Sequence, residues 1–83
     1  MVLADVGRGD WVLCQITSNP YADALAVEIT AADFSFGALR AVSYARPGKL
    51  FTASDALITS ELGVLNSVAF RRVLDAVVNL LDP

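Results

Sequence analysis

The sequence predicts a mainly β domain with a C-terminal α-helix, in which that helix closes a small, strongly bent antiparallel sheet. Three observations support this fold class. Runs of β-forming residues separated by Gly, Pro and Asn turns fill the first part of the chain, and only the C-terminal segment shows helical spacing of its apolar residues. The length of 83 residues allows one hydrophobic core, so residues 1–83 are expected to form a single domain.

The N-terminal part of the chain predicts two strands. Residues 5–10 are rich in turn formers, and two glycines there can take positive φ. Residues 11–18 follow as a run of β-formers that is apolar on both faces until its end, which is typical of a central strand. Residues 19–23 have the composition of a turn, and the alternation of apolar and polar side chains over 25–30 predicts a half-buried strand.

The middle of the chain is less regular. We expect residues 34–37 to form a turn or short helical piece that brings two aromatic rings inward. Residues 40–45 predict a third strand, 46–49 a tight turn, and 50–52 a fourth, short strand. Residues 56–59 can form a single helical turn.

The last segment predicts an amphipathic helix. Ser67 is a natural N-cap, because its hydroxyl can accept a hydrogen bond from the first helical turn. Apolar residues then recur at helical spacing and define the face expected to be buried: Phe70, Val73, Leu74, Val77, Leu80 and Leu81.

The composition excludes several classes of function. The chain has no His, which rules out His-based catalytic triads and His metal sites, and its single Cys cannot form an internal disulfide or a structural zinc site. The Asp residues lack the spacing of a metal-binding loop, so we predict no metal. Six Lys and Arg against nine Asp and Glu give a net charge of −3, which disfavours a protein that coats duplex nucleic acid.

The apolar residues bear on compartment and partners. The N-terminus lacks the basic and apolar regions of a signal peptide, and the apolar runs are far shorter than the ~20 residues that span a bilayer. We therefore expect a cytoplasmic protein without membrane contact. Hydrophobic residues make up 55% of the chain, above the usual ~45–50%. Such a high apolar content in a small chain favours a surface that is covered by a partner, most simply by a second copy in a homodimer.

Two short segments are candidates for chemistry, and each has a structural alternative. Thr17 and Ser18 stand where the central strand runs out into a loop, so their hydroxyls could bind a phosphate or act as a nucleophile. Alternatively, they cap a turn before an Asn-Pro pair. Arg46 and Lys49 place two cations on the expected tight turn, where they could contact phosphate or simply solvate a charged hairpin.

Other polar or reactive residues favour structural roles. Arg71 and Arg72 share a helix face with Asp75, which predicts a solvated and partly paired surface. Cys14 is expected to be a small buried hydrophobe.

The order of the segments resembles the MazF/PemK toxin family over essentially the whole chain. The central run over residues 9–18 has the family's pattern of an acidic residue, a hydrophobic strand and Ile-Thr followed by a small polar residue. Further landmarks follow in the family's order: Val27-Glu28-Ile29, Gly37-Ala38-Leu39, Ser43-Tyr44-Ala45-Arg46, Lys49-Leu50-Phe51-Thr52, Ile58 and Leu62-Gly63-Val64-Leu65.

The resemblance implies a compact SH3-like β-barrel, usually a homodimer, that cuts single-stranded mRNA and is neutralised by a cognate antitoxin. It implies no cofactor, and contact with DNA only through an antitoxin complex. The RNA's own 2′-hydroxyl attacks the adjacent phosphate, so the protein need only align that phosphate and stabilise charge on its oxygens.

The resemblance also implies roles for individual residues. The family's Thr after the central strand corresponds to Thr17, with Ser18 beside it, and we expect both at the catalytic centre. We expect four further residues to contact RNA: Gln15, Asn19, Arg46 and Lys49.

The start of the sequence departs from the family. Family members begin with a hairpin whose second strand is entered through an Arg-Pro pair that supplies the catalytic Arg, and residues 1–5 match only the tail of that strand. The resemblance therefore implies a domain that is incomplete at its N-terminus, in which no residue takes the role of that Arg.

Two other functions remain open on the sequence. The chain could be a degenerate or truncated family member that dimerises or binds an antitoxin without catalysis. Outside the family, a small β-barrel could bind single-stranded RNA by stacking bases on Trp11 or Tyr44, although core packing also explains both rings.

Overall fold

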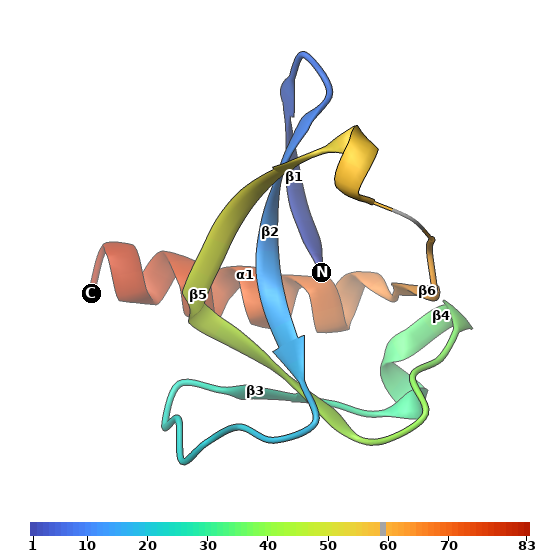
Figure 1. Cartoon of the computed structure of the whole chain (residues 1–83). Coiled ribbons are helices and arrows are strands. Elements are labelled where there is room, and N and C mark those ends of the chain that lie inside the picture. The colour runs from blue at the N-terminus through green and yellow to red at the C-terminus, as the bar shows by residue number, and fades with distance from the viewer. Residues whose placement is uncertain (59) are drawn as a thin grey trace.

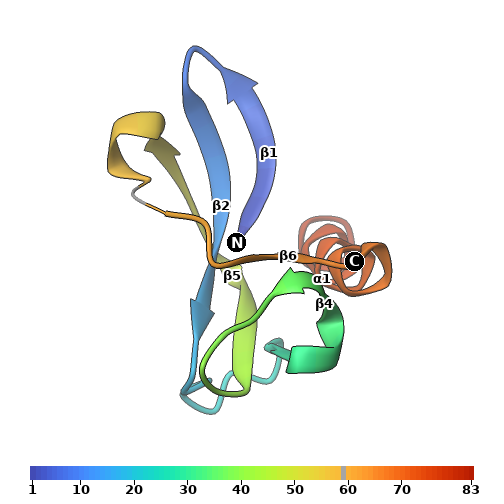
Figure 2. The same ribbon diagram turned by 90° about the vertical axis from the view of Figure 1, so that its right-hand side faces the viewer.

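The computed structural model describes residues 1–58 and 60–83, and over these residues it shows two antiparallel sheets and one helix (Figure 1). The larger sheet has the strand order β1-β2-β5-β3 and curls like half a barrel, and the smaller pairs β4 with β6. Two 3₁₀ turns, η1 and η2, precede β4 and β6, and β6 leads directly into α1 (Figure 2). The elements are β1 Val2–Gly7, β2 Asp10–Thr17, β3 Val27–Ile29, η1 Ala31–Asp33, β4 Phe34–Gly37, β5 Ser43–Ser54, η2 Asp55–Leu57, β6 Gly63–Leu65 and α1 Ser67–Leu81. The predicted mainly β class with a bent sheet and a C-terminal helix is thus confirmed.

The first strands form a tight hairpin where the sequence predicts a turn. Gly7 pairs with Asp10 across a two-residue loop, and both loop residues, Arg8 and Gly9, take positive φ. This is the backbone conformation that matches the right-handed twist of the flanking strands. Positive φ at Gly7 and Gly9 confirms the expectation for the two glycines.

Strand β5 corrects the prediction of two strands joined by a tight turn. Ser43–Ser54 is one strand, and both of its halves pair with β2. Cys14 pairs with Leu50 and the next residue, Gln15, pairs with Arg46, so residues 47–49 bulge out of the ladder. Proline has no N–H for a ladder bond, and here a Pro-Gly pair bends the strand within a bulge instead of reversing it.

Residues 34–37 form strand β4, not the expected turn or helical piece, because they pair with β6. Phe34 packs against the core, as predicted, but Phe36 is 66% exposed, so only one of the two rings lies inward. The predicted helical turn over 56–59 corresponds to η2 up to Leu57, while residue 59 lies outside the described residues.

The C-terminal helix is confirmed, with two corrections. The N-cap is Asn66 instead of Ser67, because the Asn66 side chain accepts a hydrogen bond of 2.8 Å from the Ala69 N–H. The buried positions are Ala69, Val73 and Val77, whereas Leu74 and Phe70 are half-buried and Leu80 and Leu81 are exposed. The last turns of α1 extend beyond β5, as Figure 1 shows, so no sheet covers Leu80 and Leu81.

The core lies between the concave face of the larger sheet and α1. Its fully buried members are Cys14, Ile29, Ala45 and Val73. Burial raises the pKa of the Cys14 thiol, which packs with its sulfur 3.3 Å from the Arg46 carbonyl oxygen. Cys14 is therefore the buried hydrophobe that the sequence predicts.

Candidate functional site

The end of β2 forms a tight polar turn. The Thr17 hydroxyl accepts a hydrogen bond from the Asn19 N–H over 3.1 Å and donates one to the Asn19 carbonyl oxygen over 3.0 Å. Thr17 is half-buried, and Ser18 is exposed. Thr17 therefore has the turn-capping contacts of the structural alternative, while its hydroxyl stays at the rim of the sheet.

The loop after β2 holds an aromatic ring out in solvent. The Asn19 Oδ1 atom accepts a hydrogen bond of 2.9 Å from the Tyr21 N–H, and the Asp23 N–H donates over 2.9 Å to the Pro20 carbonyl oxygen. Between these bonds, Tyr21 and Ala22 both have positive φ, 53° and 59°. This left-handed conformation costs an L-residue about 1–2 kcal/mol, and it persists only where the surrounding contacts enforce it.

Arg46 joins this loop to the sheet. Its Nε lies 2.9 Å from Asp23 Oδ2, and its Nη1 donates to Gln15 Oε1 over 3.3 Å. Its guanidinium carbon lies 5.6 Å from the centroid of the Tyr21 ring, within the range of a cation–π interaction. The Arg46 and Asp23 side chains are only 17% and 15% exposed, so this pair is far better shielded from solvent than a typical surface ion pair.

The charges at this corner partly balance. The hydrogen bond from Arg46 is the main reason why the pKa of the Asp23 carboxyl lies below its usual range, and the Leu25 N–H and the charge of Lys49 act in the same direction. Asp23 is therefore ionised at neutral pH and compensates Arg46. Lys49, which is exposed in the bulge of β5, adds a second cation.

The structure brings most of the predicted site residues together. The Gln15 amide bonds to Arg46, and two residues farther along β2 the Thr17 hydroxyl bonds to the Asn19 backbone. The charge of Lys49 helps to lower the pKa of Asp23, the partner of Arg46. Ser18 is adjacent to Thr17 in the chain and exposed. We call this set, with Tyr21 and Asp23, the β2 corner.

Sequence reasoning missed Tyr21 and Asp23. Both lie in a segment that it assigned only to a turn, and their contacts depend on Arg46, which is distant in the chain. The available signal was an aromatic residue inside a turn composition, a position where a ring has little chance of burial.

The two rings considered for base stacking are half-buried. The Trp11 Nε1 donates a hydrogen bond to the Asp55 carboxylate, and the Asp55 N–H donates to the Gly9 carbonyl oxygen over 2.7 Å. Trp11 thereby ties η2 to the tip of the β1–β2 hairpin. Tyr44 lies within β5, opposite Thr17 on β2.

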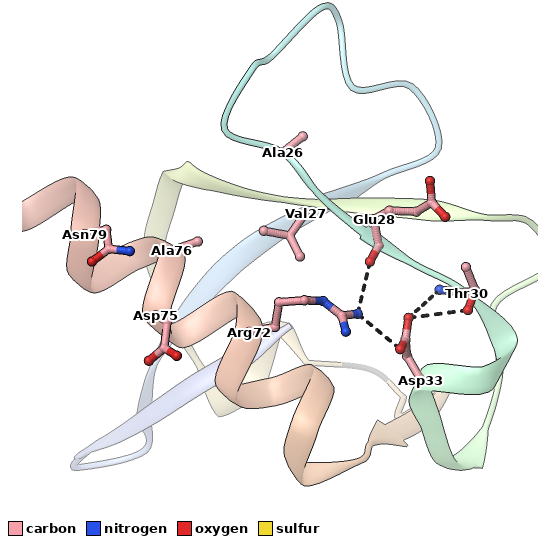
Figure 3. Close-up of a pocket in the computed structure, with 9 residues that line it drawn as sticks. All are labelled: Ala26, Val27, Glu28, Thr30, Asp33, Arg72, Asp75, Ala76 and Asn79. Atoms are coloured by element: carbon pink, nitrogen blue, oxygen red, sulfur yellow. Dashed lines mark hydrogen bonds and ion pairs between the residues drawn. The ribbon is translucent and has the colours of Figure 1, made fainter.

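A second polar site lies between α1 and β3 (Figure 3). Arg72 is 3.1 Å from Asp33 and donates to the Glu28 carbonyl oxygen over 3.3 Å, so it ties the helix to η1 and β3. The predicted pairing on the exposed face is present only for Arg71, which lies 3.8 Å from Asp75. Glu28, Asp33 and Arg72 line a hollow of about 620 Å³. Figure 3 shows the Arg72 side chain pointing from α1 toward Asp33.

The Asp33 carboxylate is held from both sides. Hydrogen bonds from the Thr30 N–H, and then from Arg72, keep its pKa below the usual range. The same carboxylate closes a capping box on η1 with Thr30. These contacts give Asp33, Thr30 and Arg72 a structural role, because they hold the helix against the sheet.

An apolar hollow of about 810 Å³ opens between β2, β6 and the segment before β6. Trp11, Leu13 and Phe34 line its interior, and Leu62 and Val64 lie at its rim, where they are 65% and 45% exposed. Exposed apolar side chains that border a hollow are typical of a surface that contacts another protein.

No protein-family model matches this chain, and a search of curated proteins finds no match either. Within residues 1–58 and 60–83, no three Cys, Asp or Glu side chains gather in a way that could hold a metal ion. In the same described part of the chain, no helix has both the length and the apolar character needed to cross a membrane.

Proposed function

We propose that this chain is a toxin-type endoribonuclease of the MazF/PemK kind, with an SH3-like barrel fold, which cuts single-stranded mRNA without a metal. The single observation that supports this best is the β2 corner. Thr17, which the resemblance assigns to catalysis, lies there with residues expected to contact RNA, Arg46 and Lys49 among them, and with the exposed Tyr21 ring. The resemblance supplies the reaction, and the corner supplies groups suited to it.

The reaction would proceed through the substrate's own hydroxyl. The 2′-oxygen attacks the neighbouring phosphorus, the bond to the 5′-oxygen breaks, and the products are a cyclic phosphate and a 5′-hydroxyl. One proton leaves the 2′-hydroxyl and one reaches the departing oxygen. The protein's tasks are to hold the phosphate in line and to stabilise the charge that develops on its oxygens.

Thr17 fits the role of a donor to such a phosphate. Its proton now points to the Asn19 carbonyl oxygen. A hydroxyl rotates freely about its C–O bond, so the same proton can turn to a phosphate oxygen without any movement of the heavy atoms. Arg46 and Lys49 would contribute the positive field at this corner.

Replacing the Thr17 hydroxyl tests this role. Thr17→Val keeps the shape of the side chain and removes the oxygen, and we expect cleavage of a single-stranded RNA to slow by about 10²–10³-fold, the usual cost of losing one such donor. Thr17→Ser, the matched control, keeps the hydroxyl and should retain most of the activity. The readout is the initial cleavage rate, with circular dichroism to verify the fold. Equal rates for Thr17→Val and the unchanged protein would remove Thr17 from the mechanism.

A second function is favoured by one observation. Arg46 donates to Asp23 and Gln15, so its charge is partly compensated before any RNA arrives. A degenerate family member that binds an antitoxin or dimerises without catalysis would have no need of a free cation. Neither cleavage nor binding of RNA by the unchanged protein, together with dimerisation or binding of an antitoxin peptide, would favour this alternative.

We also propose a homodimer as the working state, neutralised by a cognate antitoxin. The accessible surface is 5563 Å², whereas a folded monomer of this mass has roughly 4,800 Å². The excess is close to the roughly 800 Å² that each partner contributes to a standard interface. The apolar hollow and its rim are the surface that a second copy would cover.

The mass in solution tests the dimer. Light scattering at micromolar concentration should return about twice the chain mass of 8.8 kDa. Leu62→Asp places a charge on the rim of the hollow and should shift the mass to that of one chain, because burying an unpaired carboxylate in an interface is costly. Leu81→Asp, which changes a residue of similar exposure at the far end of α1, should leave the mass unchanged. A measured mass of one chain for the unchanged protein would refute the dimer.

A further inference from the structure

We infer that Tyr21 is a stacking platform for one unpaired base of the RNA, an inference that rests on the proposed function and assigns a binding role to a residue outside the catalytic contacts. It follows from three features of the loop after β2. The ring is exposed, a guanidinium supports it, and the backbone that carries it is held in an unfavourable conformation.

The Tyr21 ring has one supported side and a large exposed area. The guanidinium carbon of Arg46 lies over the ring at 5.6 Å from its centroid, yet 65% of the residue is accessible to solvent. Arg46 is itself fixed by Asp23 and Gln15, so it cannot easily leave the ring. A base that stacks on the exposed part would extend an existing column of guanidinium and aromatic ring.

The loop holds the Tyr21 ring in place through an unfavourable backbone conformation. Tyr21 and Ala22 are consecutive non-glycine residues with positive φ, and the contacts of Asn19 and Pro20 hold them there. Glycine at position 22 would relieve the conformation there but would also loosen the segment that carries the ring. A ring fixed before binding loses little freedom when a base stacks on it, which favours affinity.

The surroundings of the ring favour a nucleic acid over a protein partner. A protein hot spot is usually an aromatic anchor within a dry, apolar setting. Tyr21 instead lies among polar groups: its N–H bonds to the Asn19 amide, and Arg46 lies over its ring. Arg46 in turn contacts the Gln15 amide and the Asp23 carboxylate. Amides and cations next to a ring suit a chain of bases and phosphates, and an exposed base is available only in a single strand.

Binding of ten-nucleotide oligomers tests the inference. The probes are oligoadenylate with methylated 2′-hydroxyls, which cannot be cut by 2′-attack, and an abasic oligomer with the same backbone. Tyr21→Leu should weaken binding of oligoadenylate by about 5- to 150-fold, the range for the loss of one base stack, and should leave binding of the abasic oligomer unchanged. Tyr21→Trp should preserve binding, and oligoadenylate, but not the abasic oligomer, should quench the fluorescence of the new Trp.

Phe36→Leu is the matched control. Phe36 is 66% exposed, as Tyr21 is 65%, but it lies on β4 in the smaller sheet, so its replacement should leave binding unchanged. Equal affinity of Tyr21→Leu and the unchanged protein for oligoadenylate would overturn the stacking role. So would an equal loss of binding for both oligomers, because a damaged loop would affect backbone contacts as well.

The proposed function is tested separately, by cleavage of unmodified RNA. Base-dependent binding without cleavage would overturn the endoribonuclease and support the stacking platform. If Tyr21→Leu cleaves RNA and binds oligoadenylate as well as the unchanged protein does, the endoribonuclease is supported and the stacking platform is overturned. If the unchanged protein binds neither oligomer, the stacking platform is overturned, whatever the result with unmodified RNA.

Discussion

A single deoxyribose at the cleaved position should leave an RNA substrate intact under conditions in which the all-ribose oligomer is cut completely. The attacking atom in the proposed mechanism is the 2′-oxygen of that nucleotide, and deoxyribose lacks it. The effect should therefore be a loss of all measurable product. The measurement is gel analysis of an oligomer whose cut site has first been mapped. A deoxyribose at the next nucleotide but one, the control, should permit cleavage.

The same mechanism predicts that EDTA leaves the cleavage rate unchanged. The substrate provides the nucleophile, and the β2 corner would stabilise charge through Thr17, Arg46 and Lys49, so no step of the proposal uses a divalent ion. Cleavage that requires magnesium, or that proceeds equally well on DNA, would refute 2′-hydroxyl attack and with it the proposed reaction.

Replacing Gly37 with alanine should destabilise the fold by about 2–5 kcal/mol, from the left-handed backbone and the overpacking together. Gly37 has φ +72°, and a Cβ atom there would lie 2.2 Å from the Leu62 carbonyl oxygen and 2.6 Å from the Gly63 Cα. The obstacle is the backbone at and just before the start of β6, where Gly63 pairs with Gly37, and it cannot move without opening the smaller sheet. For a domain of this size the loss is a large fraction of the total free energy of unfolding.

Gly48→Ala is the control for Gly37→Ala. An added Cβ at Gly48 would meet nothing within 4 Å, and Gly48 is outside the region of positive φ. Its substitution should therefore leave stability within about 0.5 kcal/mol, or raise it slightly through the unfolded chain. The measurement is the urea midpoint followed by Trp11 fluorescence. Equal midpoints for the two variants would show that β4 and β6 do not pack as closely as described.

Local patterns were sufficient to predict much of the fold. The spacing of Val73 and Val77 predicted a helix, and the β-forming run through Cys14 predicted the central strand, because each pattern reflects burial of one element against the rest. The prediction was wrong at residues 46–49, where a Pro-Gly pair is typical of a chain reversal. Whether such a pair turns or bulges depends on the partner of the residues on either side, and both sides pair with β2. That is a non-local property.

The candidate site shows the same division. The position of Thr17 at the end of a strand is visible in the sequence, and so are the charges of Arg46 and Lys49. The contact between Arg46 and Tyr21 could not be predicted from the sequence. It depends on the register between β2 and β5 and on the positive φ angles of two loop residues. Turn composition indicated where the chain leaves the sheet, but not which ring it would present.

The continuity of β5 has a consequence for the order of folding. Its ladder with β2 joins Asp10 to Ser54 and Thr17 to Tyr44, and its first residues also pair with β3. These contacts close long loops, which makes them slow to form compared with the local contacts of a helix or hairpin. During synthesis the β2 corner cannot assemble until β5 has emerged from the ribosome. The nascent chain would therefore lack the proposed RNA site until more than half of it has been made.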